Sequence, residues 1–416
     1  MVAIGDLLDA IETSPAGPSV GALFVDDRAL VAGAADGGGA PDASVSAGGD
    51  PAAEARRRFV ALVAPNVYPE SRDLVEAHRR RSHTVIICTS APRHEVQPLA
   101  EDLGVDHVVS VDVAADDLAV IHEIDLGASF AYGGGDGDLR LLEQFGHPCA
   151  LNPTRGLQAA ANARGWPTAR WTSRGAADPL MVARTVAALG SVVPSFLAAV
   201  PAGILGGGRR AVFTRGMSTW GRLSTALAGV TLHVEGRENL RKQRPAVFIM
   251  NHQSGLDGLI GAALFEDDYT VVASAKLRRN PIIGPIGWLA DAAFVESGPE
   301  AVKSLESVTK VIESGVSIGI APEGTRSPTR RVGPFKKGAF RIAMASGVPV
   351  VPVVVRNAGD LMPGKSVVIR PGTVDVRVLE PIPVDDWTLE NLDARIEEVH
   401  QLYVQTLADW PRRHGS

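Results

Sequence analysis

Residues 246–257 read AVFIMNHQSGLD, and this stretch decides the fold class. Its first five residues form an apolar run typical of a strand that is buried on both faces, and a short polar segment then leads into a second apolar stretch. Comparable apolar runs lie at residues 269–274, 317–321 and 348–355. Strands of this kind, separated by helical stretches, predict an α/β sheet whose functional loops meet at one edge.

The N-terminal half shows the same alternation. Strands are predicted at four apolar runs, residues 21–26, 83–89, 107–111 and 129–132. We therefore expect a doubly wound, Rossmann-like α/β domain over residues 1–180 and a second α/β domain over residues 231–416. Residues 31–53 are rich in Gly, Ala, Asp, Ser and Pro and contain no aromatic side chain, which predicts a disordered insert. Near the C-terminus, strands are expected at residues 367–369 and 373–379 and an amphipathic helix at residues 389–408.

The composition limits the possible partners. The 416 residues are 45% hydrophobic and 21% charged, which is a globular balance and excludes a wholly disordered or fibrous chain. Residues 1–180 carry 14 arginines, no lysine and 25 acidic side chains, a net charge of −11, whereas residues 181–416 carry +5. The second half therefore suits anions such as phosphates or lipid headgroups, but neither half is basic enough to indicate nucleic acid. Two cysteines cannot form a disulfide framework, which favours a reducing compartment.

A stretch of 24 residues without charge separates Arg184 from Arg209. As one helix it would extend about 36 Å, which is long enough to cross a bilayer, but Pro194, Pro201 and the glycines at 206–208 argue against a straight span. The following stretch mixes arginines with large apolar side chains and fits an interfacial helix. We expect residues 181–230 to associate with a membrane surface; the alternative is a buried hairpin packed between the domains.

The first candidate site lies in the polar part of the opening stretch. Ser254 is suited to cap a helix that begins at Gly255, which would place Asp257 in its first turn. A histidine just before a helix can then approach this aspartate. The carboxylate would fix the tautomer of His252 and leave its other nitrogen able to accept a proton from a hydroxyl group. On this segment alone, the simpler interpretation is that Asp257 caps the helix and His252 is a loop residue.

A second polar segment follows the predicted strand at 317–321. It reads PEGTRSP at residues 322–328, and FKKG follows at residues 335–338. One glutamate, one arginine and two lysines at the carboxyl edge of a sheet would form a polar site with excess positive charge, suited to a phosphate. The alternative is a solvated turn with a structural Glu–Arg pair.

Together the two segments resemble the motifs of the glycerolipid acyltransferases, most closely the 1-acylglycerol-3-phosphate acyltransferases. The sequence VPVVP at residues 348–352 is similar to a further block of that family, and the resemblance covers residues 185–400. It implies transfer of a fatty acyl group from acyl-CoA or acyl carrier protein to the free hydroxyl of a lysophosphatidate-like acceptor. It also implies a peripheral or monotopic enzyme on the cytoplasmic face of the cell membrane. No cofactor is implied beyond the acyl donor.

The resemblance also implies roles for particular residues. His252 would be the general base, and Asp257 would orient its imidazole. The acceptor side would be formed by seven residues: Glu323, Gly324, Thr325, Arg326, Lys336, Lys337 and Lys276. Arg326 would bind the acceptor phosphate. The family's second block normally ends in an arginine, but the matching residue is Ser297, which leaves other acceptors open, such as glycerol-3-phosphate or another lipid.

The N-terminal domain resembles the haloacid-dehalogenase superfamily, in particular its phosphoserine-phosphatase-like members. The similar segments are FVDDRAL at 24–30, ICTS at 87–90, YGGGDGD at 132–138 and the stretch at 141–167. In this register Val25 takes the place of the nucleophilic aspartate and Gly134 that of the first Mg²⁺ ligand. A register that uses Asp26 or Asp27 as nucleophile, with Asp136 and Asp138 as ligands, restores part of the site. It still lacks the charge-stabilising lysine of such phosphatases, because no lysine precedes Lys242. We therefore expect an inactive phosphatase domain, and a bifunctional enzyme or a non-catalytic lipid-binding module remain alternatives.

Overall fold

The computed structural model consists of two compact units, unit 1 (Met1–Ala176) and unit 2 (Ala177–Pro411). It describes residues 1–25, 27–33, 50–266, 268–271, 273–274, 294–295, 308–364 and 366–410. The helical segment expected at 181–230 belongs to unit 2.

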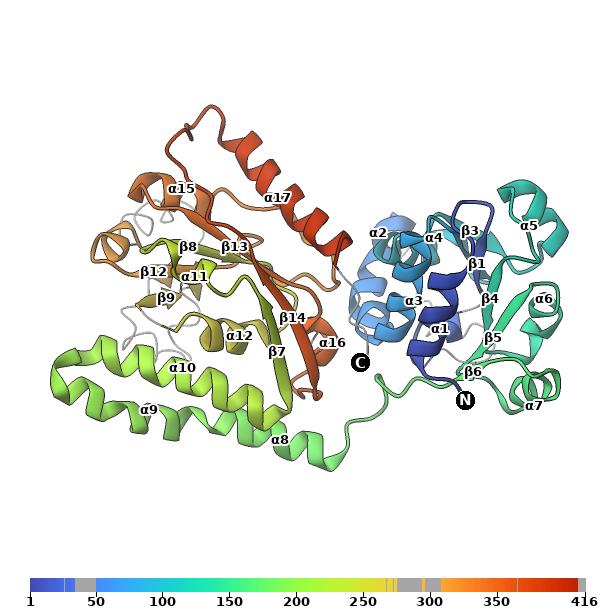
Figure 1. The fold of residues 1–416 in the computed structure, drawn as a ribbon, viewed down its shortest axis with the longest axis horizontal. Helices are drawn as coiled ribbons and strands as arrows, with labels where there is room; N and C mark the ends of the chain where they lie inside the picture. The colour runs from blue at the N-terminus through green and yellow to red at the C-terminus, as the bar shows by residue number, and fades with distance from the viewer. Residues whose placement is uncertain are drawn as a thin grey trace. The chain divides into compact units, whose positions relative to one another are not determined.

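Unit 1 is a doubly wound α/β domain, as the alternation of apolar runs predicts. Its sheet, within the described residues, has six parallel strands in the order β3-β2-β1-β4-β5-β6 (Figure 1). The strands are β1 (Gly21–Val25), β2 (Thr84–Thr89), β3 (His107–Ser110), β4 (Phe130–Gly133), β5 (His147–Leu151) and β6 (Thr168–Ala169). Because β1 lies in the middle and the chain proceeds outward on one side and then on the other, the loops after β1 and β4 lie side by side.

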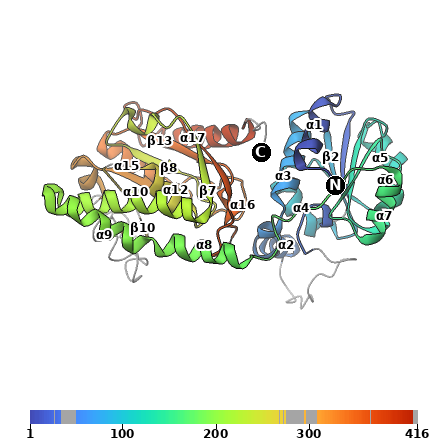
Figure 2. The same cartoon turned by 60° about the horizontal axis from the view of Figure 1, so that its bottom comes forward.

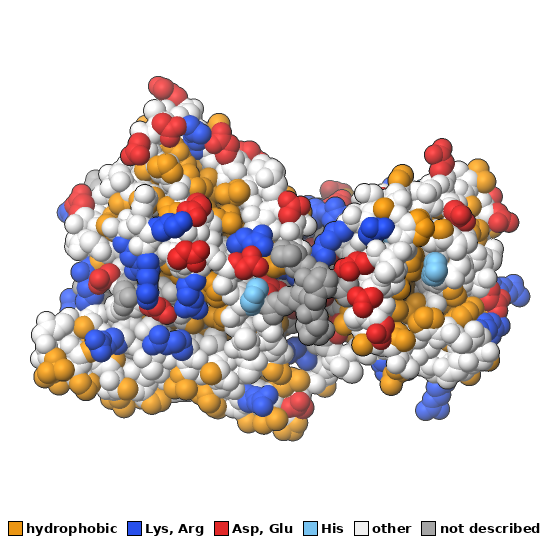
Figure 3. Space-filling view, viewed as in Figure 1, with side chains coloured by type: hydrophobic (Ala, Val, Ile, Leu, Met, Phe, Trp, Pro, Cys, Tyr) orange, Lys and Arg blue, Asp and Glu red, His pale blue; other side chains and the backbone are white. Residues whose placement is uncertain are grey.

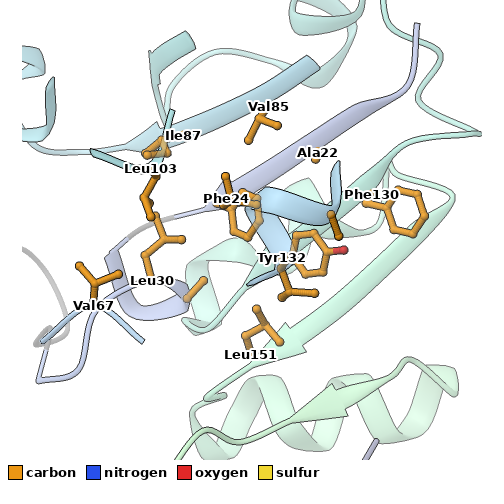
Figure 4. Packing of buried hydrophobic residues seen from close by; sticks show 14 of the residues in the cluster. Ala22, Phe24, Leu30, Val67, Val85, Ile87, Leu103, Phe130, Tyr132 and Leu151 are labelled. Atoms are coloured by element: carbon orange, nitrogen blue, oxygen red, sulfur yellow. The ribbon is translucent and has the colours of Figure 1, made fainter. Parts of the chain in front are cut away.

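Helices cover both faces of this sheet. They are α1 (Ile4–Thr13), α2 (Pro51–Arg58), α3 (Pro69–Arg80), α4 (Arg93–Leu103), α5 (Ala115–His122), α6 (Leu139–Leu142) and α7 (Arg155–Arg164). Helices α1, α3 and α4 share one hydrophobic core with the sheet, and α5, α6 and α7 share the other. In the first core the rings of Phe24 and Tyr132, on adjacent strands, stack with their centroids 4.8 Å apart (Figure 4).

Unit 2 is also an α/β domain, with a mixed sheet of six described strands in the order β7-β14-β13-β8-β12-β9. The strands are β7 (Val230–Glu235), β8 (Val247–Met250), β9 (Tyr269–Val271), β12 (Ser317–Ile320), β13 (Val350–Val355) and β14 (Gly372–Val378). Only the β13–β14 pair is antiparallel among these described pairings. A separate parallel pair is formed by β10 (Ala273–Ser274) and β11 (Phe294–Val295). The loops after β8, β12 and β13 therefore leave the same edge of the sheet.

The helices of unit 2 also cover two faces. They are α8 (Pro179–Gly190), α9 (Val192–Ala202), α10 (Gly208–Ala228), α11 (Asn239–Lys242), α12 (Asp257–Leu264), α15 (Gly338–Ser346), α16 (Ala358–Leu361) and α17 (Leu392–Ala408). Helices α10 and α12 pack in one hydrophobic core, and α15 and α17 in the other.

The uncharged segment folds as a helical hairpin. The chain reverses between α9 and α10, so that α10 runs back beside α9 and α8 (Figures 1 and 2). Gly206 and Gly208 adopt φ values of +106° and +59°, which a residue with a side chain rarely adopts, so the glycines permit this reversal. The stretch Pro179–Ala228 is apolar and long enough to cross a membrane by composition, but only 22% of its most apolar window is buried. As the prolines and glycines predict, the segment does not form a straight span; it folds as a hairpin whose large apolar side chains are largely exposed.

Three expectations about secondary structure need correction. Residues 51–53 of the expected insert are helical, because Asp50 caps α2 by accepting the Ala52 N–H at 3.0 Å; residues 34–49 lie outside the described part. Residues 367–369 form no strand: this described stretch includes Ile369, whose N–H bonds the Thr185 hydroxyl at 3.0 Å instead of a neighbouring strand. The helix expected from Gly255 begins at Asp257.

Candidate active site

His252 and Asp257 lie at the carboxyl edge of the unit 2 sheet. His252 is in the loop after β8, and Asp257 is the first residue of α12. The imidazole Nδ1 of His252 lies 2.7 Å from Oδ2 of Asp257, and the same oxygen accepts the backbone N–H groups of Gln253 at 2.7 Å and Ser254 at 2.8 Å. Because a carboxylate only accepts, the proton of a neutral His252 resides on Nδ1, which leaves Nε2 with a free electron pair.

The two side chains differ in exposure. The Asp257 side chain is 1% exposed and that of His252 is 30% exposed. A buried acid therefore orients an imidazole that solvent or a substrate can reach. The alternative in which Asp257 only caps its helix is insufficient, because the carboxylate bonds the histidine as well as the backbone.

The end of β8 is held by side chains that replace sheet hydrogen bonds. Asn251 accepts the Val355 N–H at 2.7 Å and donates its amide to the Val355 carbonyl at 2.8 Å. The Tyr403 hydroxyl donates to the Ile249 carbonyl at 2.6 Å and accepts the Val353 N–H at 3.1 Å. These bonds connect β8 to β13 where regular pairing ends, and they fix the position from which His252 projects.

Ser254 does not cap the helix as predicted; its hydroxyl forms two other hydrogen bonds. Its hydroxyl accepts the Leu256 N–H at 3.1 Å and donates to the Met362 carbonyl at 2.7 Å. The side chain thus ties the histidine loop to the segment after α16, and the helix starts two residues later than predicted.

The loop after β12 is bonded directly to the histidine loop. The carboxylate of Glu323 accepts the His252 N–H at 2.7 Å and the Gly333 N–H at 2.8 Å, while the Ser327 N–H donates to the His252 carbonyl at 2.7 Å. Burial raises the pKa of Glu323, and the two N–H groups oppose that rise. Glu323 therefore joins the loop after β12 to the histidine loop through backbone groups, a role that neither the expected acceptor site nor the alternative Glu–Arg pair included.

Two predicted cations lie on this joined structure. A Cβ atom placed on Gly255 would lie 3.7 Å from Nη1 of Arg326, so this exposed guanidinium is beside the histidine loop. A Cβ atom on Gly324 would lie 2.6 Å from Nζ of Lys336, and Gly324 has a φ of +69°. Position 324 therefore favours glycine because of its left-handed backbone conformation, whereas the flexible Lys336 side chain can move aside.

The other predicted acceptor residues are placed less closely. Lys337 forms an ion pair with Asp393 of α17 at 2.6 Å, and this contact directs its ammonium group toward α17. Thr325 is exposed beside Arg326. Lys276 and Ser297 lie outside the described residues.

Three residues near the site were not predicted from the sequence. Gln253 donates its side-chain amide to the Arg330 carbonyl at 3.1 Å, and the guanidinium of Arg330 bonds the carboxylate of Asp360 on α16. Gln253 stands next to His252 and could have been considered, but no sequence signal connects Arg330 with Asp360, because they are brought together only by the adjacency of β12, β8 and β13.

The described residues of unit 1 do not fit the Mg²⁺ that haloacid-dehalogenase-like phosphatases use; Asp26, a candidate in the alternative register, lies outside the described residues. A Cβ atom at Gly134 would lie 2.8 Å from Cδ of Arg28 and 2.8 Å from the Leu151 carbonyl oxygen, so no ligand side chain fits there without movement. The Asp138 carboxylate accepts the N–H groups of Gly134 and Gly135, both at 2.8 Å. Asp136 caps α7 through the Leu157 N–H at 2.7 Å. Among the described residues, no group of three His, Cys, Asp or Glu side chains is placed to hold a metal ion.

Both units match protein families. The Acyltransferase family matches residues 231–356, which include the histidine loop and the loop after β12, and the haloacid dehalogenase-like hydrolase family matches residues 44–144. The fold and site of unit 2 therefore define an acyltransferase domain, and unit 1 carries a haloacid-dehalogenase-like domain.

Relatives of known name specify the family further. The chain is 32% identical over 199 residues to the 1-acyl-sn-glycerol-3-phosphate acyltransferase of Limnanthes alba, covering 47% of this chain and 70% of that protein. It is 35% identical over 188 residues to the protein of the same name from Saccharomyces cerevisiae, covering 44% of this chain and 62% of the yeast protein. The structure of the 1-acyl-sn-glycerophosphate acyltransferase from Thermotoga maritima aligns with 25% identity and a TM-score of 0.46, over 55% of this chain and 97% of that one. The chain belongs to the acyltransferase family that includes these proteins.

Proposed function

We propose that this acyltransferase transfers a fatty acyl group from acyl-CoA or acyl carrier protein to the free hydroxyl of 1-acyl-glycerol-3-phosphate, which forms phosphatidate. The observation that carries the proposal is the 2.7 Å contact between His252 and Asp257, with Arg326 beside the same loop. The names of the relatives support this choice of acceptor.

The arrangement can perform the transfer in one displacement. Nε2 of His252 takes the proton of the acceptor hydroxyl as its oxygen attacks the thioester carbonyl carbon. The resulting imidazolium is stabilised by the buried carboxylate of Asp257. When the tetrahedral intermediate collapses, the C–S bond breaks and the proton on Nε2 passes to the departing thiolate. Because both substrates are held together, no acyl-enzyme intermediate is required.

The acceptor phosphate would bind Arg326, with Lys336 assisting. A guanidinium offers paired N–H donors that suit phosphate oxygens, and a second cation nearby adds to the attraction. Since His252 already serves as base and acid, we propose that the transfer needs neither a metal ion nor another cofactor. Chelation with EDTA would then leave the rate unchanged.

We also propose that the helical hairpin seats unit 2 on a membrane surface at the cytoplasmic face. Side chains of α8 and α9 that are buried in the structure are small: Thr185, Ala188, Ser191, Ser195 and Ala199. Those that are exposed include large apolar ones: Leu180, Val182, Val186, Leu189, Val193, Leu197 and Val200. Figure 3 shows hydrophobic side chains gathered along this edge of unit 2. An apolar face of this extent with arginines on α10 is typical of a helix that lies in the membrane interface.

The proposal is tested with the purified full chain and its His252→Ala variant. Each is incubated with acyl-CoA and with 1-acyl-glycerol-3-phosphate, glycerol-3-phosphate or a glycolipid in phospholipid vesicles, and products are identified by mass. We expect phosphatidate from the wild-type protein and none from the variant. A product from glycerol-3-phosphate alone would overturn the acceptor, and liposome binding without any transfer would favour the non-catalytic lipid-binding module.

A further inference from the structure

Three segments form a closed ring around His252. The loop after β12 bonds the histidine loop through Glu323 and Ser327, and the histidine loop bonds the segment after α16 through Ser254. The ring is completed by Arg330, in the loop after β12, whose Nε donates to Oδ2 of Asp360 on α16 at 3.1 Å. This ion pair therefore links the loop after β12 to α16, and both of these segments are bonded to the histidine loop.

The pair is nearly removed from solvent. The side chain of Arg330 is 13% exposed and that of Asp360 is 9% exposed. A charge pair in this environment has a defined geometry, and loss of one partner leaves the other charge poorly solvated. Exposed ion pairs of unit 2, such as Lys242 with Glu380 at 45% and 70% exposed, lack this property and contribute little.

The pair is connected both to the histidine loop, which holds the proposed base, and to the loop that holds the proposed phosphate ligand. The carbonyl of Arg330 accepts the side-chain amide of Gln253 at 3.1 Å, and Gln253 directly follows His252. Arg326, the proposed phosphate ligand, lies four residues before Arg330 in the same loop. Arg326 lies between Glu323 and Ser327, which bond the His252 backbone directly, so a shift of the loop at Arg330 would act on Arg326 together with these bonds while leaving the His252–Asp257 bond within its own loop intact.

We propose that the Arg330–Asp360 ion pair is a positioning pair that fixes the distance between the proposed phosphate ligand Arg326 and the proposed base His252. It determines how well an acceptor with a phosphate and a free hydroxyl spans the two. The inference rests on the proposed function and deepens it. Neither residue is expected to contact a substrate, and loss of the pair is not expected to change binding of the acyl donor.

The test uses the full chain in vesicles, with steady-state kinetics for acyl-CoA and for 1-acyl-glycerol-3-phosphate and with thermal unfolding. In Asp360→Asn, we expect KM for the acceptor to rise about tenfold, KM for the donor to stay within about twofold, and the unfolding temperature to fall. The double variant Arg330→Met/Asp360→Asn contains no unpaired buried charge. We expect its unfolding temperature to recover while KM for the acceptor stays raised.

The double variant distinguishes positioning from general stability. If KM for the acceptor returns to the wild-type value together with the unfolding temperature, the pair is merely structural and the inference is overturned. It is also overturned if both substrates are affected equally. Glu380→Gln, which breaks an exposed pair of the same unit, is the control and should change neither quantity. If Asp360→Asn does not fold, the double variant alone decides. If the wild-type protein transfers no acyl group, the proposed function fails, and the inference with it; normal transfer with an unchanged acceptor KM in both variants overturns only the inference.

Discussion

Nδ1 of His252 lies 2.7 Å from Oδ2 of Asp257, although five positions separate them in the chain. The same carboxylate oxygen accepts two backbone N–H groups of the intervening loop, so one acidic side chain both shapes the loop and orients the imidazole. A spacing of five residues is sufficient for both roles, because the loop closes on this carboxylate.

We expect Asp257→Asn to lower kcat by about 10²- to 10⁴-fold. If the amide oxygen takes the place of Oδ2, it keeps the two backbone bonds and the bond from Nδ1, but the neutral amide no longer stabilises the imidazolium that forms when His252 takes the proton. The measurement is kcat at several pH values with acyl-CoA as donor. Circular dichroism checks that the fold persists. A variant that keeps half of the wild-type rate would contradict the role assigned to the carboxylate charge.

Arg326→Ala should act on the acceptor. Loss of the guanidinium removes a charge-assisted contact with phosphate, and we expect KM for 1-acyl-glycerol-3-phosphate to rise about tenfold or more while KM for acyl-CoA is unchanged. Steady-state kinetics with each substrate varied in turn provide the measurement, and Lys242→Met removes a distant exposed cation as a control. A higher KM for the donor instead would place the phosphate site elsewhere.

The stability of unit 1 should depend on pH through a buried chain of hydrogen bonds. Nε2 of His83 is 2.8 Å from the Pro15 carbonyl, its Nδ1 is 2.8 Å from Nδ1 of His78, and Nε2 of His78 is 2.8 Å from the Tyr132 hydroxyl. Because a carbonyl only accepts, His83 is protonated on Nε2, so His78 donates from Nδ1 and accepts the Tyr132 proton. With both histidines neutral, every bond of this chain forms.

Burial, together with the neighbouring His83, places the pKa of His78 well below its ordinary value of 6.5, and burial also lowers that of His83. The unfolded chain therefore binds more protons than the folded one once the pH falls below about 6.5, and unit 1 loses stability as the pH decreases from there. Hydrogen exchange of β4 between pH 7.5 and 5.5 measures this loss. The quantity compared is the protection factor, which removes the intrinsic pH dependence of amide exchange. We expect it to depend less on pH in His78→Gln, and protection factors that do not change with pH in the wild-type protein would refute the role of the network.

Acidic substitutions on the outer face of α9 should weaken membrane binding. Val193 and Leu197 are 61% and 65% exposed, so Val193→Glu/Leu197→Glu should leave the unfolding temperature unchanged. If these side chains enter the membrane interface, loss of their burial should reduce partitioning into phospholipid vesicles by about 100-fold. Co-sedimentation measures it, and Leu389→Glu, at a site 75% exposed elsewhere in unit 2, is the matched control. Equal binding by both variants would show that the hairpin is not the membrane contact.

The sequence by itself determined the fold class and the contact between His252 and Asp257 at the candidate site. Apolar runs of strand length predicted most strands of both sheets, because strands buried on both faces must be apolar throughout. The spacing of His252 and Asp257 predicted their contact, because a turn that leads into a helix brings residues at that separation together. These are local relations, which neighbouring residues specify without the rest of the chain.

Only the tertiary structure decided what lies across the sheet edge from the histidine. Glu323 bonds the backbone of His252, Arg330 pairs with Asp360, and Lys337 pairs with Asp393 on α17 away from the predicted cluster. It also decided that the uncharged segment folds back as a hairpin with its large side chains outward. The physical reason is that these contacts depend on which strands become neighbours, and strand order is set by packing of the whole sheet and not by any single stretch of sequence.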